Sequence, residues 1–386
     1  MIDVIIPVYK GLQQTRRCID SVLRSARLTA FEIVAIDDAS PDADIARYLD
    51  ELAGKGCITL VRNESNLGFV QSVNRGMSLH PDRDVVLLNS DTEVANDWLD
   101  RLRRAAYAYP DVGTVTPFSN NATICSYPFD GWAGGVPGTL GLAALDRLFA
   151  STNAGRTVDL PTAVGFCMCI RRACLDQLGL FDAQRFGRGY GEENDFCMRA
   201  AGAGWRNVLA GDVFVYHEGA VSFSGERLAL TTNAGKLLMN LHPDYLRKVR
   251  AYVQHDPAGT LRAAVDSARI AQDEGELRQV LDERIEERAL MKARLTEAEI
   301  YADEREPLIV KLRQGLALTE TLIVERDAEI AQLRAEIARL RAGLSHAETL
   351  AFERAGELAE LQKSWLWKCR IYLMRRKARR ATPPPA

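Results

Sequence analysis

The stretch of sequence that decides the fold runs Asp84-Val85-Val86-Leu87-Leu88-Asn89-Ser90-Asp91. Its four consecutive branched aliphatic residues predict a strand buried on both faces, as in a parallel sheet covered by helices. The strand breaks into a polar turn that carries the carboxylate of Asp91. Because open α/β sheets bind ligands just beyond the carboxyl ends of their strands, Asp91 is a candidate metal ligand. Taken alone, the same carboxylate could equally cap the next helix.

Strand-like and helix-like segments alternate on both sides of this stretch, up to about residue 241. Strands are expected at residues 4–7, 31–36 and 58–61, and helices at 15–25, 45–53 and 68–77. This alternation predicts right-handed βαβ units and therefore an α/β fold built on a parallel sheet. Further along, the pattern becomes irregular. There we expect a glycine- and proline-rich loop at 131–141 and strands at 163–170 and 208–215.

The composition is that of an ordinary soluble protein, with 386 residues, 47% hydrophobic, 26% charged and a formal net charge of -3. This length favours two structural units. The cysteines at 167, 169 and 174 lack a zinc-site spacing, so we expect buried reduced thiols. No stretch reaches the ~18 apolar residues that a membrane-spanning helix needs. We therefore expect a cytoplasmic protein.

Four polar motifs stand at the ends of predicted strands or before a predicted helix. They are Pro7-Val8-Tyr9, Asp37-Asp38-Ala39-Ser40, Asn66-Leu67-Gly68 and Asn89-Ser90-Asp91. In a doubly wound sheet these loops lie side by side along one edge. A nucleotide there needs a flat surface, a hydrogen-bond acceptor and a cation for its diphosphate, which Tyr9, Asp38 and a metal on Asp91 would supply. The chain has no glycine-rich phosphate loop, so hard oxygen ligands indicate Mg²⁺ or Mn²⁺.

Two later segments carry further candidate groups. The acids Glu192, Glu193 and Asp195 crowd a predicted helix start, where the helix dipole alone would favour them. Adjacent carboxylates also raise one another's pKa, which suits a general base that deprotonates an acceptor hydroxyl. His217 ends a predicted strand, and either a structural role or a role as a metal or diphosphate ligand fits that position.

These motifs, together with the segment from Arg171-Arg172 to Phe181-Asp182, resemble family 2 glycosyltransferases of the GT-A fold over residues 2–225. The resemblance implies a Rossmann-like, nucleotide-sugar-binding domain. The nucleotide-binding residues that it implies are Pro7, Val8, Tyr9, Asp37, Asp38, Asn66, Gly68, Asn74 and Ser90. It also implies that Asp91 and His217 bind the metal and that Glu193 is the base, with Glu192 beside it and Asp195 as a rival.

The chain departs from the family pattern at two positions. Asn89 replaces the first Asp of the metal-binding DxD motif, and Glu193 replaces the usual Asp of the base. The Gln-x-x-Arg-Trp signature of processive members is absent, which favours single or few sugar additions. The resemblance thus implies an inverting transfer from a nucleotide sugar to a glycan or lipid-linked acceptor in cell-surface polysaccharide biosynthesis. We expect acceptor specificity to lie in residues 118–165.

Two other functions compete with this interpretation. The chain could be a coiled-coil scaffold whose transferase domain binds nucleotide sugar without turnover, because Asn89 and Glu193 are unusual. A sugar-phosphate nucleotidyltransferase would need a glycine-rich, arginine-containing loop near the N-terminus, and Pro7-Val8-Tyr9-Lys10-Gly11 is not one.

The second half of the chain has a helical heptad pattern. From Ile309 to Trp365 apolar residues recur at 3-4 spacing, with Ile and Leu alternating in its middle part. This pattern predicts a long α-helical coiled coil, and the pairs Glu329–Arg334 and Glu336–Arg341 favour a parallel homodimer. A single amphipathic helix folded back on the globular domain is the alternative.

The C-terminal segment is aromatic and basic, with seven Lys or Arg residues and no acid from residue 364 onward. Such a segment suits an anionic membrane surface, so we expect a peripheral location at the inner face of the cell membrane and no nucleic acid partner. Nucleic-acid binding and a plain solvated helix end are the alternatives. The predicted organisation is a GT-A domain at 1–245, a helical linker at 246–306, a coiled coil at 307–365 and a basic aromatic tail at 366–386.

Overall fold

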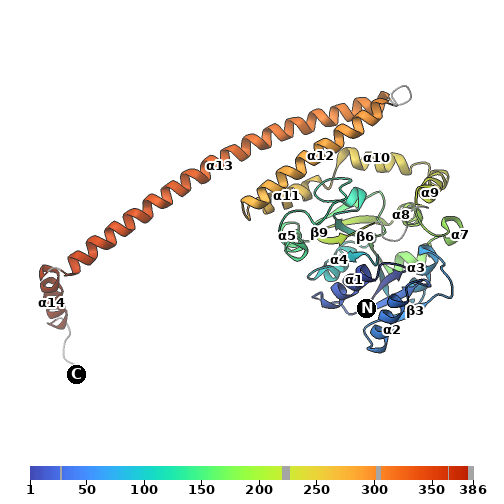
Figure 1. The fold of residues 1–386 in the computed structure, drawn as a ribbon, viewed down its shortest axis with the longest axis horizontal. Helices are drawn as coiled ribbons and strands as arrows, with labels where there is room; N and C mark the ends of the chain where they lie inside the picture. The colour runs from blue at the N-terminus through green and yellow to red at the C-terminus, as the bar shows by residue number, and fades with distance from the viewer. Residues whose placement is uncertain (27, 220–226, 301–305, 364, 381–386) are drawn as a thin grey trace. The chain divides into compact units, whose positions relative to one another are not determined.

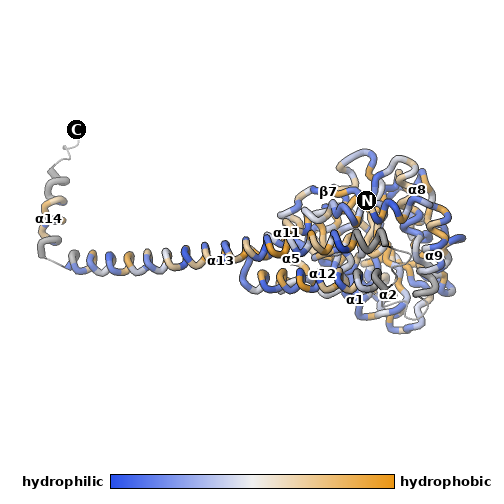
Figure 2. Tube along the Cα trace, turned by 90° about the horizontal axis from the view of Figure 1, so that it is seen from above, coloured by the Kyte–Doolittle hydropathy of each residue, from blue (hydrophilic) through white to orange (hydrophobic). Residues whose placement is uncertain are grey.

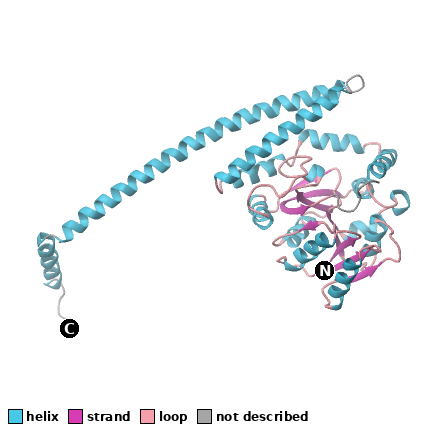
Figure 3. Cartoon of the chain, viewed as in Figure 1, coloured by secondary structure: helices cyan, strands magenta, loops and turns pink. Residues whose placement is uncertain are grey.

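The computed structural model describes residues 1–386 except 27, 220–226, 301–305, 364 and 381–386. The chain divides into two compact units, Met1–Glu287 and Arg288–Ala386. Figure 3 shows that the described strands belong to the first unit, whereas the described part of the second is helical. Residues 301–305 of the predicted linker, residue 364 of the predicted coiled coil and residues 381–386 of the predicted basic tail lie outside the described residues.

In the described residues of the first unit, the strands form one mixed sheet in the order β3-β2-β1-β4-β8-β6-β9-β5, with β7 also paired to β9. The strands are β1 (Ile2–Val8), β2 (Phe31–Asp37), β3 (Thr59–Arg62), β4 (Asp84–Leu88), β5 (Thr92–Glu93), β6 (Val112–Ser119), β7 (Thr157–Leu160), β8 (Cys167–Ile170) and β9 (Arg206–His217). The first four neighbours in the order, β3 to β4, are parallel, as predicted. The sheet then departs from the prediction, because β8 runs antiparallel to both β4 and β6.

The helices of the first unit cover both faces of this sheet (Figure 1). They are α1 (Leu12–Arg24), α2 (Ala43–Gly54), α3 (Phe69–Met77), α4 (Trp98–Ala106), α5 (Leu142–Thr152), α6 (Arg172–Leu178), α7 (Ala183–Phe186), α8 (Glu192–Gly202), α9 (Arg227–Leu241), α10 (Tyr245–His255) and α11 (Gly259–Ile270), with a short 3₁₀ turn at Thr123–Cys125. Helices α1, α2 and α4 pack on one face, and α3, α6 and α8 on the other. The α/β fold class is therefore confirmed, and the domain resembles the GT-A fold.

The aliphatic run that ends in Asp91 builds both layers of the core. Val86 and Leu88 point into one hydrophobic cluster, whereas Val85 and Leu87 point into the other. This is the alternation of side chains expected along a strand, and all four residues are fully buried. A strand covered on both faces in this way holds its carboxyl end rigidly. The turn with Asp91 therefore has a fixed position in the fold.

The first unit extends past the predicted boundary at residue 245. Arg269 of α11 is fully buried and binds Glu276 and Glu283, each at 2.7 Å, and the Tyr127 hydroxyl at 3.0 Å. Glu276 also accepts hydrogen bonds from the backbone and the hydroxyl of Thr139. This buried network joins the segment predicted to be a linker to the irregular region of the domain. Residues 246–287 are thus part of the compact unit.

The second unit contains the end of α12 (Glu274–Ile300), α13 (Glu306–Lys363) and α14 (Trp365–Arg380). Helix α13 begins one residue before Pro307, as the sequence predicts for a first-turn proline. Near its start, Glu320 and Thr319 contact Arg288 and Met291 of α12. Hydrophobic residues recur along the rest of α13 (Figure 2). In the described part of the chain, none of the helices has the length and hydropathy needed to cross a bilayer.

Candidate active site

The two predicted metal ligands meet at the end of the central sheet. Strand β5 pairs antiparallel with β9, which places Thr92 opposite His217, and the backbone N–H of Glu218 donates to the carbonyl of Asp91 at 3.0 Å. As a result, Nε2 of His217 lies 3.5 Å from Oδ1 of Asp91, although 126 residues separate them in the sequence. Both side chains are only slightly exposed, at 14% and 13%. The convergence predicted for these two residues is therefore present.

Two asparagines fix the orientation of His217. The Asn120 side chain accepts from the His217 backbone N–H at 2.8 Å and donates to its carbonyl at 3.0 Å. The Asn121 carbonyl lies 2.7 Å from Nδ1 of the imidazole. Since a carbonyl oxygen can only accept, the proton sits on Nδ1, and Nε2 faces the Asp91 carboxylate. Sequence reasoning missed Asn120 and Asn121, because hydrogen bonds to the backbone leave no recognisable motif.

The geometry of this pair fits a cation. Nε2 of His217 and an oxygen of Asp91 face each other, and in the neutral imidazole both atoms are acceptors that attract a positive charge between them. An imidazole nitrogen together with a carboxylate oxygen is a donor set for divalent transition metals. The turn that carries Asp91 is itself braced, because Asn89 donates its backbone N–H to the carbonyl of Phe166 at 2.9 Å.

The segment Gly165-Phe166 connects this pair to the carboxylates of α8. The ring of Phe166 stacks on the imidazole of His217, with centroids 5.3 Å apart and an interplanar angle of 18°. A Cβ atom added at Gly165 would lie 3.8 Å from the carboxyl carbon of Glu193. Helix α8 therefore presents its first residues to the same edge of the sheet as Asp91 and His217.

Glu192 and Glu193 form a buried carboxyl pair at the N-terminus of α8. The two carboxyl groups lie close enough to influence each other's pKa. The Oε2 atom of each is buried without a hydrogen-bond partner among the described residues. Burial, and then the charge of Glu193, raises the pKa of Glu192 well above its ordinary value, and burial also raises the pKa of Glu193. A carboxyl group with a raised pKa is the kind of group that suits a general base for a hydroxyl.

Asp195, the rival candidate for the base, is occupied by ion pairs. Its Oδ2 atom accepts from Arg199 at 2.8 Å, and its Oδ1 atom lies 2.7 Å from Nε2 of His242. The side chain is 6% exposed. Both carboxylate oxygens of Asp195 already have partners within the protein, so this geometry favours Glu193 over Asp195 as the base.

Asp37 and Asp38, predicted at the nucleotide, organise their own loops. Oδ1 of Asp37 accepts from the backbone of Ser40 at 2.9 Å, and its Oδ2 accepts from Arg62 at 2.8 Å. Asp38 accepts hydrogen bonds from three donors: the side-chain amide of Asn63 and the backbone N–H groups of Leu67 and Gly68. Both carboxylates are nearly fully buried. The structure thus gives them a structural role, and their contact with a nucleotide stays a prediction.

Asn66, Gly68 and Asn74 are likewise engaged within the protein. Asn66 accepts a hydrogen bond from Arg188 at 2.9 Å. Gly68 adopts φ +85°, and a Cβ atom there would lie 2.7 Å from the Arg188 Cα, so only glycine fits. The amide of Asn74 binds the backbone of Phe181 through both of its polar atoms, at 2.8 and 3.1 Å. This pairing gives Asn74 a structural role, and its contact with a nucleotide stays a prediction.

The remaining nucleotide-binding candidates lie at the strand ends where they were predicted. Pro7 and Val8 end β1 and are half-buried and buried, and Ser90 is buried in the turn before Asp91. Tyr9 follows β1 as a partly exposed ring, with the Lys10 ammonium group 5.2 Å from its centroid. Of this set, Tyr9 offers an accessible flat surface of the kind that a base requires.

A second acidic cluster lies elsewhere in the sheet. Asp3, Glu32 and His80 have ligand atoms close enough for a metal ion. Arg83 binds both carboxylates, however, at 2.9 Å to Asp3 and 2.7 Å to Glu32, and His80 lies 2.8 Å from Asp3. Asp3 is also at the amino end of its strand, away from the edge where Asp91 lies. Because Arg83 already supplies the positive charge, we assign this cluster a structural role.

Part of the chain matches a known protein family. Residues 3–179 match the model of glycosyl transferase family 2. A curated relative, the uncharacterized protein y4gI of Sinorhizobium fredii (strain NBRC 101917 / NGR234), is 25% identical over 58% of this chain and 25% of its own length. The N-acetylgalactosaminyltransferase 7 of Drosophila melanogaster is 30% identical over 28% of this chain and 18% of its own length. The chain thus spans a quarter or less of these relatives.

Solved structures give a weaker similarity. The crystal structure of GalNAc-T7 with UDP, GalNAc and Mn²⁺ aligns at a TM-score of 0.48 and 18% identity, covering 69% of this chain and 55% of that one. The mannosyltransferase PcManGT from Pyrobaculum calidifontis, in complex with GDP-Man and Mn²⁺, aligns at a TM-score of 0.45 and 17% identity, covering 83% and 86% of the two chains.

Proposed function

We propose that this protein transfers a sugar from a nucleotide-sugar donor to a hydroxyl group of an acceptor. The single observation that carries this proposal is the 3.5 Å approach of His217 Nε2 to Asp91 Oδ1 at the carboxyl end of the central sheet. The match of residues 3–179 to the model of glycosyl transferase family 2 supports the same reaction class.

Asp91 and His217 would hold a divalent cation, Mn²⁺ or Mg²⁺. The presence of an imidazole in the donor set favours Mn²⁺ over Mg²⁺, since Mg²⁺ prefers oxygen ligands alone. When bound, the ion supplies positive charge to the diphosphate of the donor. Asn89 cannot provide a second carboxylate, so Asp91 is the only acid that this turn contributes. The hydrogen bond from His217 to the Asn121 carbonyl keeps the ligand nitrogen turned toward Asp91.

The reaction that we propose is a single inverting displacement. The Glu193 carboxylate accepts the proton of the acceptor hydroxyl. The acceptor oxygen then forms a bond to the anomeric carbon, and the bond from that carbon to the diphosphate oxygen breaks. The nucleoside diphosphate leaves with the bonding electron pair, and the configuration at carbon is inverted. The raised pKa of Glu193 suits it to this step, and Asp195 keeps Arg199 and His242 in place.

The test is to incubate the full-length protein with a panel of nucleotide sugars, with and without Mn²⁺, and to measure release of nucleoside diphosphate. We expect metal-dependent hydrolysis of at least one donor, and nearly complete loss of it in Asp91→Ala. Glu193→Gln should abolish transfer while donor binding persists. Donor binding without turnover in the wild type would instead support the second candidate, a coiled-coil scaffold with an inactive transferase domain, which Asn89 favours. Full activity of Asp91→Ala would refute the metal assignment.

We further propose that α13 forms a parallel homodimer. Leu333, Ile337, Leu340, Leu344 and Leu358 occupy core heptad positions and are 46–66% exposed in the single chain. A second copy would cover them, and the Glu329–Arg334 and Glu336–Arg341 pairs would then face each other between chains. Light scattering on the full-length protein should give a dimer. Ile337→Lys should give a monomer, whereas Ala342→Lys, at an outer heptad position, should remain dimeric.

The acceptor and the location are also proposals. The basic aromatic segment around α14 supports a place on an anionic membrane surface at the inner face of the cell, with a glycan or lipid-linked acceptor of a cell-surface polysaccharide. Transfer of single or few sugars fits the absence of the processive signature. The full-length protein should co-sediment with anionic vesicles at moderate salt and lose this binding when residues 366–386 are removed. Equal binding of both forms would refute the assignment.

A further inference from the structure

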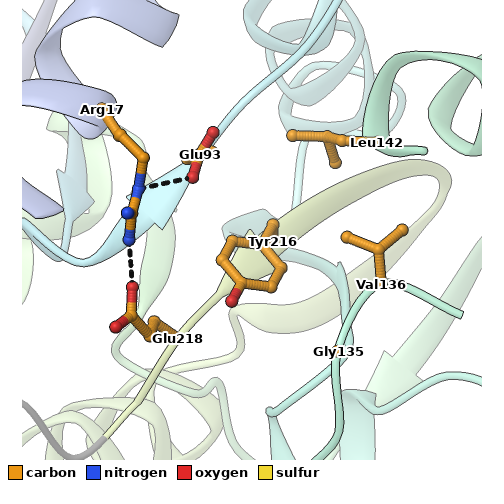
Figure 4. Close-up of a pocket in the computed structure, with 7 residues that line it drawn as sticks. All are labelled: Arg17, Glu93, Gly135, Val136, Leu142, Tyr216 and Glu218. Carbon is orange, nitrogen blue, oxygen red and sulfur yellow. Dashed lines mark hydrogen bonds and ion pairs between the residues drawn. The ribbon is translucent and has the colours of Figure 1, made fainter.

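A cavity of about 550 Å³ lies beside the strand pair β5–β9 (Figure 4). Its lining residues are Arg17, Glu93, Gly135, Val136, Leu142, Tyr216 and Glu218. Glu93 pairs with Tyr216, and Thr92 pairs with His217. Because successive side chains of a strand point to opposite faces, Tyr216 faces this cavity and His217 faces the other way. The cavity therefore lies on the face of β9 opposite to His217.

One wall of the cavity is an arrangement of charged groups. Arg17 of α1 lies between two carboxylates, with its Nε atom 3.0 Å from Glu93 and a terminal nitrogen hydrogen-bonded to Glu218. Gln14 donates to the other oxygen of Glu218 at 3.0 Å. The contacts among these side chains hold them in place. Arg17 is nevertheless 47% exposed, and the two glutamates are each 31% exposed. Hydrogen-bond donors and acceptors that are held in place and remain accessible to solvent are suited to binding the hydroxyl groups of a ligand.

The opposite wall is apolar. Figure 4 shows Tyr216 between the ion pairs and the side chains of Val136 and Leu142. A ring and two aliphatic side chains fit the carbon-bound hydrogens of a sugar ring, while the charged wall fits its hydroxyls. The charges also select the sugar. One arginine between two glutamates leaves a net negative charge, which repels uronic acids and phosphorylated sugars.

The cavity ends beside the candidate active site. The backbone N–H of Glu218, which lines the cavity, donates to the carbonyl of Asp91 at 3.0 Å. The wall of the cavity is therefore joined through the backbone to the residue that we assign to the metal. Gly135 and Val136 belong to the irregular region where we expected acceptor specificity.

We propose that this cavity is a subsite for neutral sugar units of a glycan acceptor, away from the unit that reacts. The role of this subsite in binding an acceptor rests on the proposed glycosyl transfer. Glycan binding in the cavity can nevertheless be measured without any donor.

The experiment titrates the full-length protein with neutral tetrasaccharides of glucose, galactose, mannose and N-acetylglucosamine, and with a uronic-acid tetrasaccharide. Arg17→Ala removes the charge-assisted hydrogen bonds of the cavity, and Val136→Asp adds a charge to its apolar wall. Arg47→Ala is the matched control, because Arg47 also pairs with one acid, Asp44 at 2.7 Å, on the exposed face of α2. We expect at least one neutral tetrasaccharide to bind, and each cavity variant to weaken its affinity about 10-fold or more. The control should bind like the wild type.

Three results would overturn the subsite: no neutral tetrasaccharide binds, the acidic one binds more tightly, or both cavity variants bind like the wild type. Having two variants on different elements keeps the test valid if one of them fails to fold. The proposed function fails by a different result, namely the absence of donor hydrolysis with every nucleotide sugar. Glycan binding that depends on Arg17 would in that case still establish the subsite.

Discussion

The carbonyl oxygen of Asn121 lies 2.7 Å from Nδ1 of His217, and the side chain of Asn120 binds both backbone groups of the same histidine. Outer contacts of this kind orient a metal ligand and choose its tautomer. They make the position of His217 depend on a turn almost a hundred residues earlier in the chain. The two asparagines differ in the group that makes the contact: Asn120 uses its side chain, whereas Asn121 uses its backbone carbonyl.

Asn120→Ala should weaken Mn²⁺ binding about 10-fold or more, because it removes both hydrogen bonds that position the His217 backbone. Asn121→Ala should change Mn²⁺ affinity little, since its contact to Nδ1 comes from the backbone carbonyl, which alanine retains. Titration of free Mn²⁺ by electron paramagnetic resonance measures both affinities. Equal affinities of the two variants would show that Asn120 does not position the ligand.

The pH dependence of transfer should reflect the Glu192–Glu193 pair. Burial raises the pKa of Glu193, so the base carries a proton at low pH and kcat/KM should rise with pH as the proton is lost. Glu193→Gln should lower kcat by about 10²–10⁴-fold. Glu192→Gln should retain activity with a simpler profile, because it removes the coupled titration while its amide can still donate to Glu193. A wild-type rate that is independent of pH around neutrality would count against this base.

The stability of the protein should also depend on the Glu192–Glu193 pair, and it should fall as pH rises. The folded-state pKa of Glu192 is raised above its unfolded value by burial and by Glu193. Its contribution to stability is therefore fully present below the unfolded pKa and is lost as pH rises through the folded pKa. Thermal melts of the wild type should fall toward alkaline pH more steeply than those of Glu192→Gln. Parallel curves for the two proteins would refute the raised pKa.

Asp195→Asn should act on stability rather than on chemistry. It removes a largely buried carboxylate from Arg199 and His242, which should cost about 1–3 kcal/mol in the free energy of unfolding. The kcat of the folded protein should fall much less than in Glu193→Gln. Urea denaturation and single-turnover kinetics separate the two effects. If Asp195→Asn instead loses turnover at unchanged stability, Asp195 is the base.

Truncation should test where the first unit ends. A chain that stops at residue 245 lacks Arg269, Glu276 and Glu283, and thereby loses the buried partners of Tyr127. A chain that stops at residue 300 keeps them. We expect the longer form to melt cooperatively and the shorter form to be strongly destabilised, since breaking a buried ion-pair network costs about 3–5 kcal/mol. Arg269→Ala in the full-length protein should reproduce much of the loss.

The sequence predicted the parts of the site that lie at strand ends. Asp91 and His217 could be predicted because each follows a strongly apolar strand, and such strands lead to one edge of a sheet. Strand β6 was not predicted, because Gly113 and Pro117 break its apolar pattern even though every residue of it is buried. Its position between β8 and β9 depends on tertiary pairing that the sequence does not display.

Polar residues were harder to interpret. Asp38 and Asn74 look like ligand-binding groups, but their side chains hold backbone groups of the protein, a use that composition and spacing cannot distinguish from binding. Arg269 illustrates the same difficulty. In a charged helical segment it reads as a solvent-facing residue, and only the tertiary fold places Glu276 and Glu283 around it.

Strand β5 is two residues long, Thr92–Glu93, and pairs with β9. One face of this two-stranded ribbon carries His217, and the other face carries Tyr216 and lines the cavity. An insertion or deletion of one residue between Asp91 and Glu93 would slip the register and reverse which face each side chain occupies. The histidine side of the ribbon and the cavity side would then be altered by the same event. Relatives of this protein should therefore keep the spacing from residue 91 to residue 93 constant, since evolution cannot adjust one side of so short a strand without disturbing the other.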